Sequence, residues 1–236
     1  MKLYPVVHIN DIETAKREAE HALEAGVDGV YLVDHHNGAN DTSAVFDTFK
    51  HLKNIDKDSY VGVNILGASA IQAIKLLPIA LDERKIPVAP DGWWTDDIRV
   101  KDFEPHASME YKLSTPTLVS TRILGGVAFK YRETYTDDPE EARAEAAELR
   151  RAVDVVTTSG AGTGEEPSVE KLAAMKEEIG SQPLAVASGI SASNIEKYVG
   201  HVDEVLAATS VETEKGSGVF DRDKLAELLE IAHDLR

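Results

Sequence analysis

Side chains able to transfer protons recur along this chain, each near the end of a short apolar segment. His8 ends the first segment, Asp34 the second, Asn64 the third, Asp96 the fourth and Lys130 the fifth. An imidazole, carboxylic acids and an amine are groups that enzymes use for acid–base chemistry, and an amide can orient a substrate by hydrogen bonds. We predict a catalytic set of these five residues, in which Lys130 and Asp34 or Asp96 transfer protons while His8 and Asn64 orient the substrate.

Lys130 is the most reactive member of this set. A lysine at the end of an apolar strand is expected to have a lowered pKa, because burial disfavours the ammonium form, and such a lysine suits a Schiff base or a proton transfer. The structural alternative is an ion pair with Asp96, Asp97 or a bound ligand. The sequence leaves both interpretations open.

A divalent metal is an alternative use of the same side chains. The ligand-type candidates are His8, Asp34, His36 and Asp96. They lack the HxxxH or HExxH spacing that would fix two ligands on one face, and the neighbours His35 and His36 cannot both point the same way on a strand. We therefore predict no cofactor, and the divalent metal remains the open alternative.

Glycines and small hydroxyl side chains follow the last three segments. Backbone N–H groups in glycine-rich turns and at helix amino ends bind anions, and (β/α)8 barrels often hold a phosphate after strands 7 and 8. The alternative roles are chain turns and helix caps and, for residues 160–164, a mobile lid or a flexible connector. We predict a phosphate site formed by Gly160, Gly162, Gly164, Ser188, Gly189, Thr209 and Ser210.

Eight apolar segments must position all of these residues. They occupy residues 4–9, 28–34, 61–66, 91–96, 126–131, 154–159, 184–190 and 203–209. Helical segments separate most of them, and this alternation predicts a (β/α)8 TIM barrel that forms a single domain over residues 1–236. Counting alternate residues along the strands places His8, Asn64 and Lys130 inside the barrel, at the carboxyl ends where such folds bind substrates.

Helices are expected between these strands, and acidic residues at the strand starts have a separate role. The predicted helices cover residues 11–25, 43–53, 68–83, 139–151, 169–179, 194–199 and 221–235. Residues 97–125 are the least regular part, with a helix only loosely placed. Four segments begin with an aspartate, which predicts structural roles at the barrel end opposite the substrate; these are Asp28, Asp91, Asp154 and Asp203.

Acidic residues dominate the charge of the chain. It has 42 Asp and Glu against 25 Lys and Arg, a formal net charge of −17. Such a surface repels nucleic acid and anionic membranes, so neither is predicted as a partner. The crowding of acids on the predicted helices favours a halophilic adaptation over an ordinary acidic surface. With no cysteine, no bilayer-length apolar run and no signal-peptide pattern, the sequence predicts a cytoplasmic protein.

The second half of the chain resembles the BtpA/SgcQ family of TIM-barrel proteins, whose named member is associated with photosystem I biogenesis. The similar segments are residues 154–164, 184–195 and 203–211, and His8 is the family-like histidine of the first strand. Asn10-Asp11-Ile12 replaces the Pro- and Gly-rich segment of the family, which indicates a divergent branch. The resemblance implies a barrel with a phosphorylated or nucleotide-like ligand, and it implies neither a reaction nor a role in photosynthesis.

Three functional hypotheses follow. The first is an enzyme that binds a small phosphorylated metabolite, such as a phosphosugar or a phosphoribosyl compound, with lyase or isomerase chemistry. The second is glycosyl or phosphoribosyl transfer, in which the carboxylates would stabilise positive charge on a ribose. The third is a non-enzymatic assembly or biogenesis factor that uses the outside of the barrel. A homo-oligomer is compatible with each of them.

Overall fold

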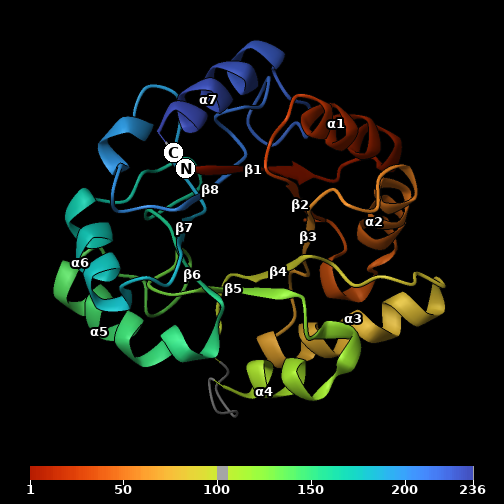
Figure 1. The fold of residues 1–236 in the computed structure, drawn as a ribbon, viewed down its shortest axis with the longest axis horizontal. Coiled ribbons are helices and arrows are strands. Elements are labelled where there is room, and N and C mark those ends of the chain that lie inside the picture. The colour runs from red at the N-terminus through yellow and green to blue at the C-terminus, as the bar shows by residue number, and fades with distance from the viewer. Residues whose placement is uncertain (100–105, 236) are drawn as a thin grey trace.

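Eight parallel strands close into a barrel in chain order, so that β1 pairs with both β2 and β8 (Figure 1). The computed structural model describes residues 1–99 and 106–235. The prediction of a (β/α)8 barrel is confirmed. The strands are β1 (Lys2–His8), β2 (Val30–Val33), β3 (Val61–Asn64), β4 (Gly92–Thr95), β5 (Arg122–Gly126), β6 (Val155–Thr158), β7 (Leu184–Val186) and β8 (Glu204–Ala207).

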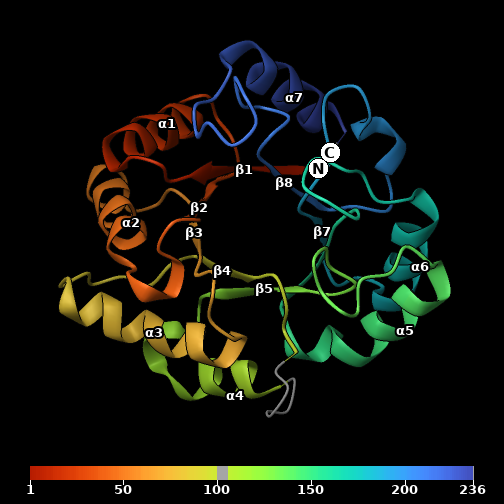
Figure 2. The same cartoon turned by 180° about the vertical axis from the view of Figure 1, so that it is seen from behind.

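Helices surround the barrel on all sides (Figures 1 and 2). Several begin at an aspartate whose side chain accepts backbone N–H bonds, as Asp138 does before α5, where a proline also occupies the first turn. The α-helices are α1 (Ile12–Glu24), α2 (Ser43–Ile55), α3 (Ala70–Glu83), α4 (Ala107–Ser114), α5 (Pro139–Leu149), α6 (Val169–Ile179) and α7 (Arg222–Asp234). The 3₁₀-helices are η1 (Gly38–Asn40), η2 (Pro116–Leu118), η3 (Arg150–Ala152) and η4 (Ile195–Tyr198).

The helix predicted over residues 194–199 was wrong in type and length. The structure has the four-residue 3₁₀-helix η4 there, and the Asn194 side chain caps the preceding turn by accepting the Ser191 amide at 2.8 Å. A single turn of this kind has no developed helix dipole. The segment after β7 therefore offers no full-length helix whose amino end could bind an anion.

The predicted position of the fifth strand was also wrong. The strand runs over Arg122–Gly126, and residues 127–131 form the loop that follows it. Ala128 and Tyr131 have left-handed backbones with φ of 47° and 63°, which a strand cannot contain. Counting alternate residues from Ala128 to Lys130 was therefore not a valid reason to point Lys130 inward. Part of the unassigned stretch 97–125 becomes α4, η2 and β5, and residues 100–105 of it lie outside the described residues.

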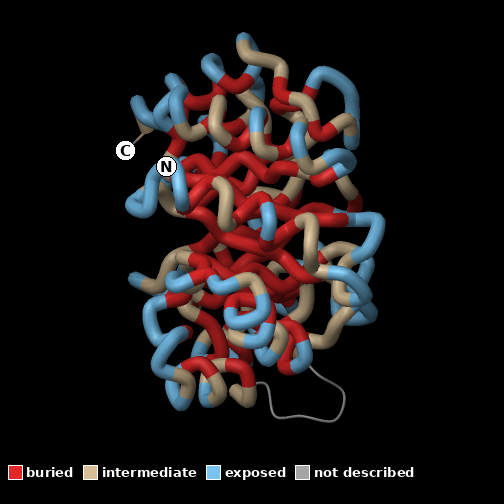
Figure 3. Tube along the Cα trace, turned by 90° about the vertical axis from the view of Figure 1, so that its right-hand side faces the viewer, coloured by how far each residue is buried: buried red, intermediate tan, exposed pale blue. Residues whose placement is uncertain are grey.

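Two hydrophobic layers result from the alternation of side chains along the strands. Leu3 and Val7 of β1 point outward to the helices, whereas Tyr4 and Val6 pack inside the barrel with Trp94 and other inward residues. Figure 3 shows this buried strand layer running through the centre of the molecule between exposed helices and loops. Within the described ranges, no helix is both long and apolar enough to cross a bilayer.

The repeated aspartates link neighbouring strands by hydrogen bonds at the amino ends of the barrel. Each precedes an even-numbered strand and accepts the first amides of the neighbouring odd-numbered strand at 2.7–2.9 Å. Three of them also pair, at 2.6–2.8 Å, with a lysine from the α-helix that precedes that odd-numbered strand. The pairs are Asp28 with the Leu3 amide, Asp91 with Val61 and Lys53, Asp154 with Ile123 and Lys112, and Asp203 with Leu184 and Lys176. Their predicted structural role is confirmed.

Candidate functional site

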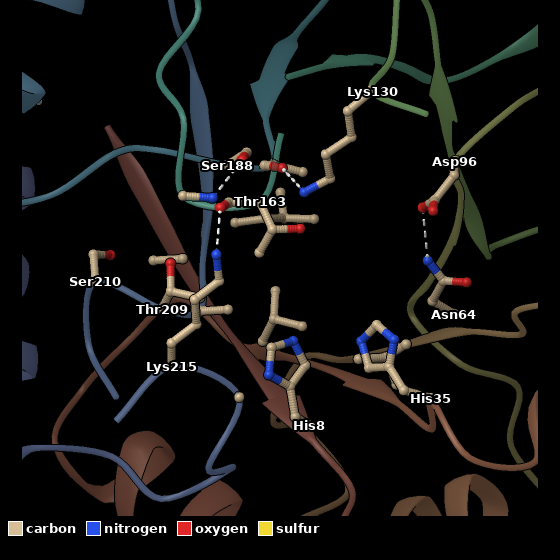
Figure 4. A pocket seen from close by; sticks show the side chains of 18 of the residues that line it. His8, His35, Asn64, Asp96, Lys130, Thr163, Ser188, Thr209, Ser210 and Lys215 are labelled. Atoms are coloured by element: carbon tan, nitrogen blue, oxygen red, sulfur yellow. Dashed lines mark hydrogen bonds between the residues drawn. The ribbon is translucent and has the colours of Figure 1, made fainter. Parts of the chain in front are cut away.

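A cavity of about 650 Å³ opens at the carboxyl ends of the strands. Its floor consists of inward side chains of the barrel such as Val6, Trp94 and Leu206. Figure 4 shows polar side chains converging on it from several strand ends. Those that the sequence predicted and that line the cavity are His8, His36, Asn64, Asp96, Lys130, Gly164, Ser188, Gly189, Thr209 and Ser210.

Asp96 and Asn64 form a pair on one side of the cavity. The Asn64 side-chain amide donates to the Asp96 carboxyl at 3.2 Å. Burial raises the pKa of Asp96, although Arg132 at 3.9 Å opposes the shift. The protonated form of Asp96 is therefore retained to higher pH than for an exposed aspartate, which suits a proton donor.

Lys130 extends into the cavity from the loop after β5. Its backbone amide donates to the Ser159 hydroxyl at 2.8 Å, and its ammonium donates to the Ala187 carbonyl at 3.2 Å. Burial lowers the pKa of Lys130, and the nearby Asp96 opposes that shift in part. The amine is held by backbone contacts rather than by a carboxylate within bonding distance, so it is available to a ligand.

His8 points into the cavity from the end of β1, beside His35 (Figure 4). Its Nδ1 lies 2.8 Å from Oε1 of Glu212, a buried residue of the loop after β8. That carboxylate also accepts the amides of Gly216 and Gly218 at 2.7 and 3.1 Å. Burial alone would raise the pKa of Glu212, but the contacts with His8 and with these amides outweigh it and lower the pKa.

The predicted anion-binding residues divide into two groups. Gly164, Ser188, Gly189, Thr209 and Ser210 line the cavity. Gly160 instead allows its loop to fold against itself, because a Cβ atom there would lie 2.2 Å from the backbone oxygen of Glu165. A Cβ atom at Gly162 would meet only the mobile end of the Glu165 side chain, at 2.7 Å, so the packing function in the loop after β6 belongs to Gly160.

Gly189 lies on the cavity but is needed for packing. Its φ is +72°, and a Cβ atom would approach the backbone of Glu165 and Glu166 to 2.4 Å. The close approach that this glycine permits is that of the 160–166 loop. Replacing Gly189 would displace that loop, so such a variant could not separate anion binding from local folding.

Asp34 is engaged in its own turn, and the metal-ligand candidates form no metal site. The Asp34 carboxylate accepts the amides of His36 and Asn37 and the Asn37 side chain, and these bonds lower its pKa against the effect of burial. Asp34 closes this turn and is not among the residues lining the cavity. Across residues 1–99 and 106–235, no group of three or more His, Asp or Glu side chains is arranged to hold a metal.

Four residues of the site were missed by the sequence analysis. Lys215 reaches across the cavity mouth from the loop after β8 and donates to the Thr163 carbonyl at 2.9 Å. The Tyr131 hydroxyl exchanges hydrogen bonds of 2.9 and 3.1 Å with Thr163. Glu212 is the fourth. The only signals for Lys215 and Glu212 were a cation and a carboxylate close to the last strand end.

The closed parallel barrel and its strand-end cavity define a TIM-barrel protein of the kind that binds small molecules at the carboxyl face. Within that class, the chain belongs to the BtpA family, whose sequence profile matches residues 8–234. The resemblance seen in the strand-end segments is thereby confirmed over nearly the whole chain. No curated protein sequence matches it.

Solved structures of several enzymes share the fold. Phosphoribosyl anthranilate isomerase from Thermus thermophilus is 14% identical, with all of both chains covered and a TM-score of 0.62. (S)-3-O-geranylgeranylglyceryl phosphate synthase from Thermoplasma acidophilum, in complex with its substrate sn-glycerol-1-phosphate, is 16% identical over 99% of this chain and 93% of the enzyme, with a TM-score of 0.64. Type I 3-dehydroquinate dehydratase from Clostridium difficile is 10% identical over 99% and 92%, with a TM-score of 0.66. These likenesses demonstrate a common fold.

Proposed function

We propose that the cavity binds a small phosphorylated metabolite and that the protein transforms it by acid–base chemistry, as an isomerase or a lyase. The observation that carries this proposal is the charge of the cavity mouth. Lys130 and Lys215 both line it in a protein whose net charge is −17. A local cationic site favours an anionic ligand. The negative charge of the rest of the molecule would otherwise repel such a ligand.

The phosphoryl group fits the side of the cavity after β7 and β8. Lys215 lies at the mouth near Thr209 and Ser210, and the Ser188 hydroxyl is on the adjacent loop (Figure 4). Cations and hydroxyl groups are the usual side-chain partners of phosphate oxygens. Two enzymes with the same fold have substrates or names that include a phosphorylated group, sn-glycerol-1-phosphate and phosphoribosyl anthranilate, which is consistent with a phosphorylated ligand here.

Glycosyl or phosphoribosyl transfer is less favoured by the geometry. That hypothesis required carboxylates near the reacting ribose, and the Asp34 carboxylate is engaged in its own turn. Asp96 lines the cavity, and burial raises its pKa, so its ionised form is less favoured than that of an exposed aspartate. A carboxyl group with a raised pKa suits proton transfer, so we retain the isomerase or lyase assignment.

Calorimetric titration tests the proposal. Ribose 5-phosphate and inorganic phosphate are added at fixed salt, with ribose as the ligand lacking the phosphoryl group. We expect Lys215→Met to weaken ribose 5-phosphate binding by about tenfold or more, since a charge-assisted hydrogen bond contributes on the order of 1.5–3 kcal/mol. Lys16→Met is the matched control, because it removes the same charge from an outer helix.

Two results would contradict the proposal. If neither phosphate compound binds the unmodified protein, the non-enzymatic assembly factor becomes the better hypothesis. If Lys16→Met weakens binding as much as Lys215→Met, the anion responds to the net charge of the molecule and the cavity is not its site.

A further inference from the structure

We propose that His8, oriented by the buried carboxylate of Glu212, is the base that removes a proton from carbon in the bound metabolite, and that this metabolite is an aldose or ketose phosphate. The inference rests on the proposed function and assigns its substrate class and its proton acceptor. It changes the role that the sequence indicated for His8, which was to orient the substrate.

The hydrogen bond to Glu212 determines which nitrogen of His8 is free. An ionised carboxylate only accepts hydrogen bonds, and the lowered pKa of Glu212 keeps it ionised. The 2.8 Å contact therefore requires Nδ1 to carry the proton. In the neutral imidazole, Nε2 is then the unprotonated acceptor, and a carboxylate behind Nδ1 stabilises the imidazolium that forms when Nε2 takes a proton.

The surroundings of His8 preserve this arrangement. Two glycine amides hold the Glu212 carboxylate from the other side, at 2.7 and 3.1 Å. The ring of His35 packs edge-on against His8 with centroids 4.9 Å apart. Burial lowers the pKa of His35, so this neighbour is neutral and does not repel a charge that develops on His8.

The proton donors lie across the barrel from His8. His8 ends β1, whereas Lys130 follows β5, and these strands are four positions apart in a closed ring of eight (Figure 1). Asp96, after β4, is next to Lys130 in strand order, and burial raises the pKa of its carboxyl group. A ligand in the centre thus has a base on one side and acids on the other.

This arrangement matches a 1,2-proton shift in a sugar phosphate. His8 Nε2 takes the proton from the carbon beside the carbonyl, and the C–H electron pair forms the double bond of an enediol. The carbonyl oxygen receives a proton from Lys130 or Asp96. Return of the first proton to the former carbonyl carbon, with loss of a hydroxyl proton to the donor, gives the isomer, so that atoms and electrons balance without an oxidant.

The tautomer of His8 tests the orienting role of Glu212 without any ligand. Two-bond ¹H–¹⁵N spectra of ¹⁵N-histidine-labelled protein distinguish Nδ1–H from Nε2–H, and His8→Asn identifies the His8 signals. We expect the Nδ1–H form in the unmodified protein and a shift toward Nε2–H in Glu212→Gln. An Nε2–H form in the unmodified protein, or an unchanged tautomer in Glu212→Gln, would overturn the proposal.

Proton exchange tests the catalytic role. Ribose 5-phosphate is incubated with the protein in D₂O, and loss of its C2 proton signal is followed by NMR. His8→Asn is informative because the asparagine amide nitrogen can replace Nδ1 as the donor to Glu212 while Nε2 is absent. We expect exchange in the unmodified protein and a rate lower by about 100-fold or more in His8→Asn, the scale of a lost general base.

The two proposals fail in different ways. If ribose 5-phosphate binds but its C2 proton does not exchange, or exchanges equally in His8→Asn, then His8 is not the base and the phosphate-binding proposal survives. If no phosphate compound binds, the proposed function itself is wrong, and the substrate class assigned here fails with it.

Discussion

Lys171 illustrates how one buried residue can fix the position of another that faces the ligand. It is fully buried on α6, and its ammonium donates to the carbonyls of Ala128 and Ser159, both at 2.9 Å. Ala128 lies in the left-handed turn that precedes Lys130, and the Ser159 hydroxyl accepts the Lys130 amide. Lys171 therefore supports both of the loops that present Lys130 to the cavity.

Burial of Lys171 predicts a specific dependence of stability on pH. Its pKa is lowered to about 8 in the folded protein from 10.5. Between these values the unfolded chain binds more protons, so the free energy of unfolding rises with pH from about 8 toward 10.5. Lys171→Met is expected to reduce this rise by up to roughly 3 kcal/mol. Urea unfolding of both proteins at several pH values measures it, and equal slopes would contradict the prediction.

Individual site residues were most directly predictable where they lie at the end of a strand. His8 and Asn64 end strands, and Asp96 lies directly after one, so the apolar segments were enough to assign them to one cavity. Glu212 and Lys215 lie in a loop whose two arms are joined by an isolated bridge between Glu212 and Phe220, and which returns to β1 through the contact of Glu212 with His8. No periodicity specifies such a return, because it depends on contacts formed after the barrel has closed.

At the scale of elements, the loops after β6 and β7 form one packed unit at the cavity mouth. The Ser188 hydroxyl donates to the Gly162 carbonyl at 2.8 Å and accepts the Gly164 amide at 3.2 Å. On the other side of the unit, the Asn194 side chain donates to the Gly189 carbonyl at 2.7 Å and to Glu166. The geometry of the proposed anion site thus depends on the packing between these two loops.

Gly189 in this unit and Gly180 at the carboxyl end of α6 allow steric packing to be separated from backbone strain. Gly189 and Gly180 both have positive φ, +72° and +62°, but a Cβ atom would meet backbone only at Gly189. Both alanine variants lose on the order of 1–3 kcal/mol of unfolding free energy from backbone strain, and Gly189→Ala is expected to lose a further 1–3 kcal/mol or so from overpacking. Chemical denaturation of the two variants measures the loss of unfolding free energy in each. Equal losses would show that the 160–166 loop moves to accommodate the added methyl group without cost.

The errors in element prediction have a common physical origin. Apolar residues continue from Ile123 through Phe129, so the run contains both β5 and the loop after it, and composition alone cannot place the boundary. The left-handed turn at Ala128 is stabilised by its amide donating to Glu145 on α5 at 2.9 Å. A tertiary contact of this kind overrides local preference and is invisible to a local pattern.

At the scale of the whole molecule, the barrel itself was predictable because eight apolar segments recur along the chain with helical segments between most of them. The surface charge is a second global property. Acidic side chains crowd α5 and α6, where Arg143 bridges Glu140 and Glu177 at 3.7 and 2.7 Å although both glutamates are largely exposed. Exposed pairs of this kind contribute little, so repulsion among the excess acids is reduced mainly by dissolved ions.

Salt is therefore expected to stabilise the fold. The melting temperature should rise strongly between dilute buffer and molar KCl, because screening removes the self-repulsion of a chain with net charge −17. Calorimetry over a KCl series measures this, with sucrose as a stabiliser that does not screen charge. A melting temperature that is flat in KCl would identify an ordinary acidic surface in place of a halophilic adaptation.

The aspartates that link strands at the amino ends also affect how this barrel tolerates exchange of its loops. They join β1 to β2, β3 to β4, β5 to β6 and β7 to β8 through side chains that lie at the end opposite the cavity. Every residue proposed to contact the ligand lies at the other end, on segments that can be exchanged without removing one of these aspartates. The molecule is thus suited to grafting, in which new mouth segments are transplanted onto an unaltered base to recruit a different substrate.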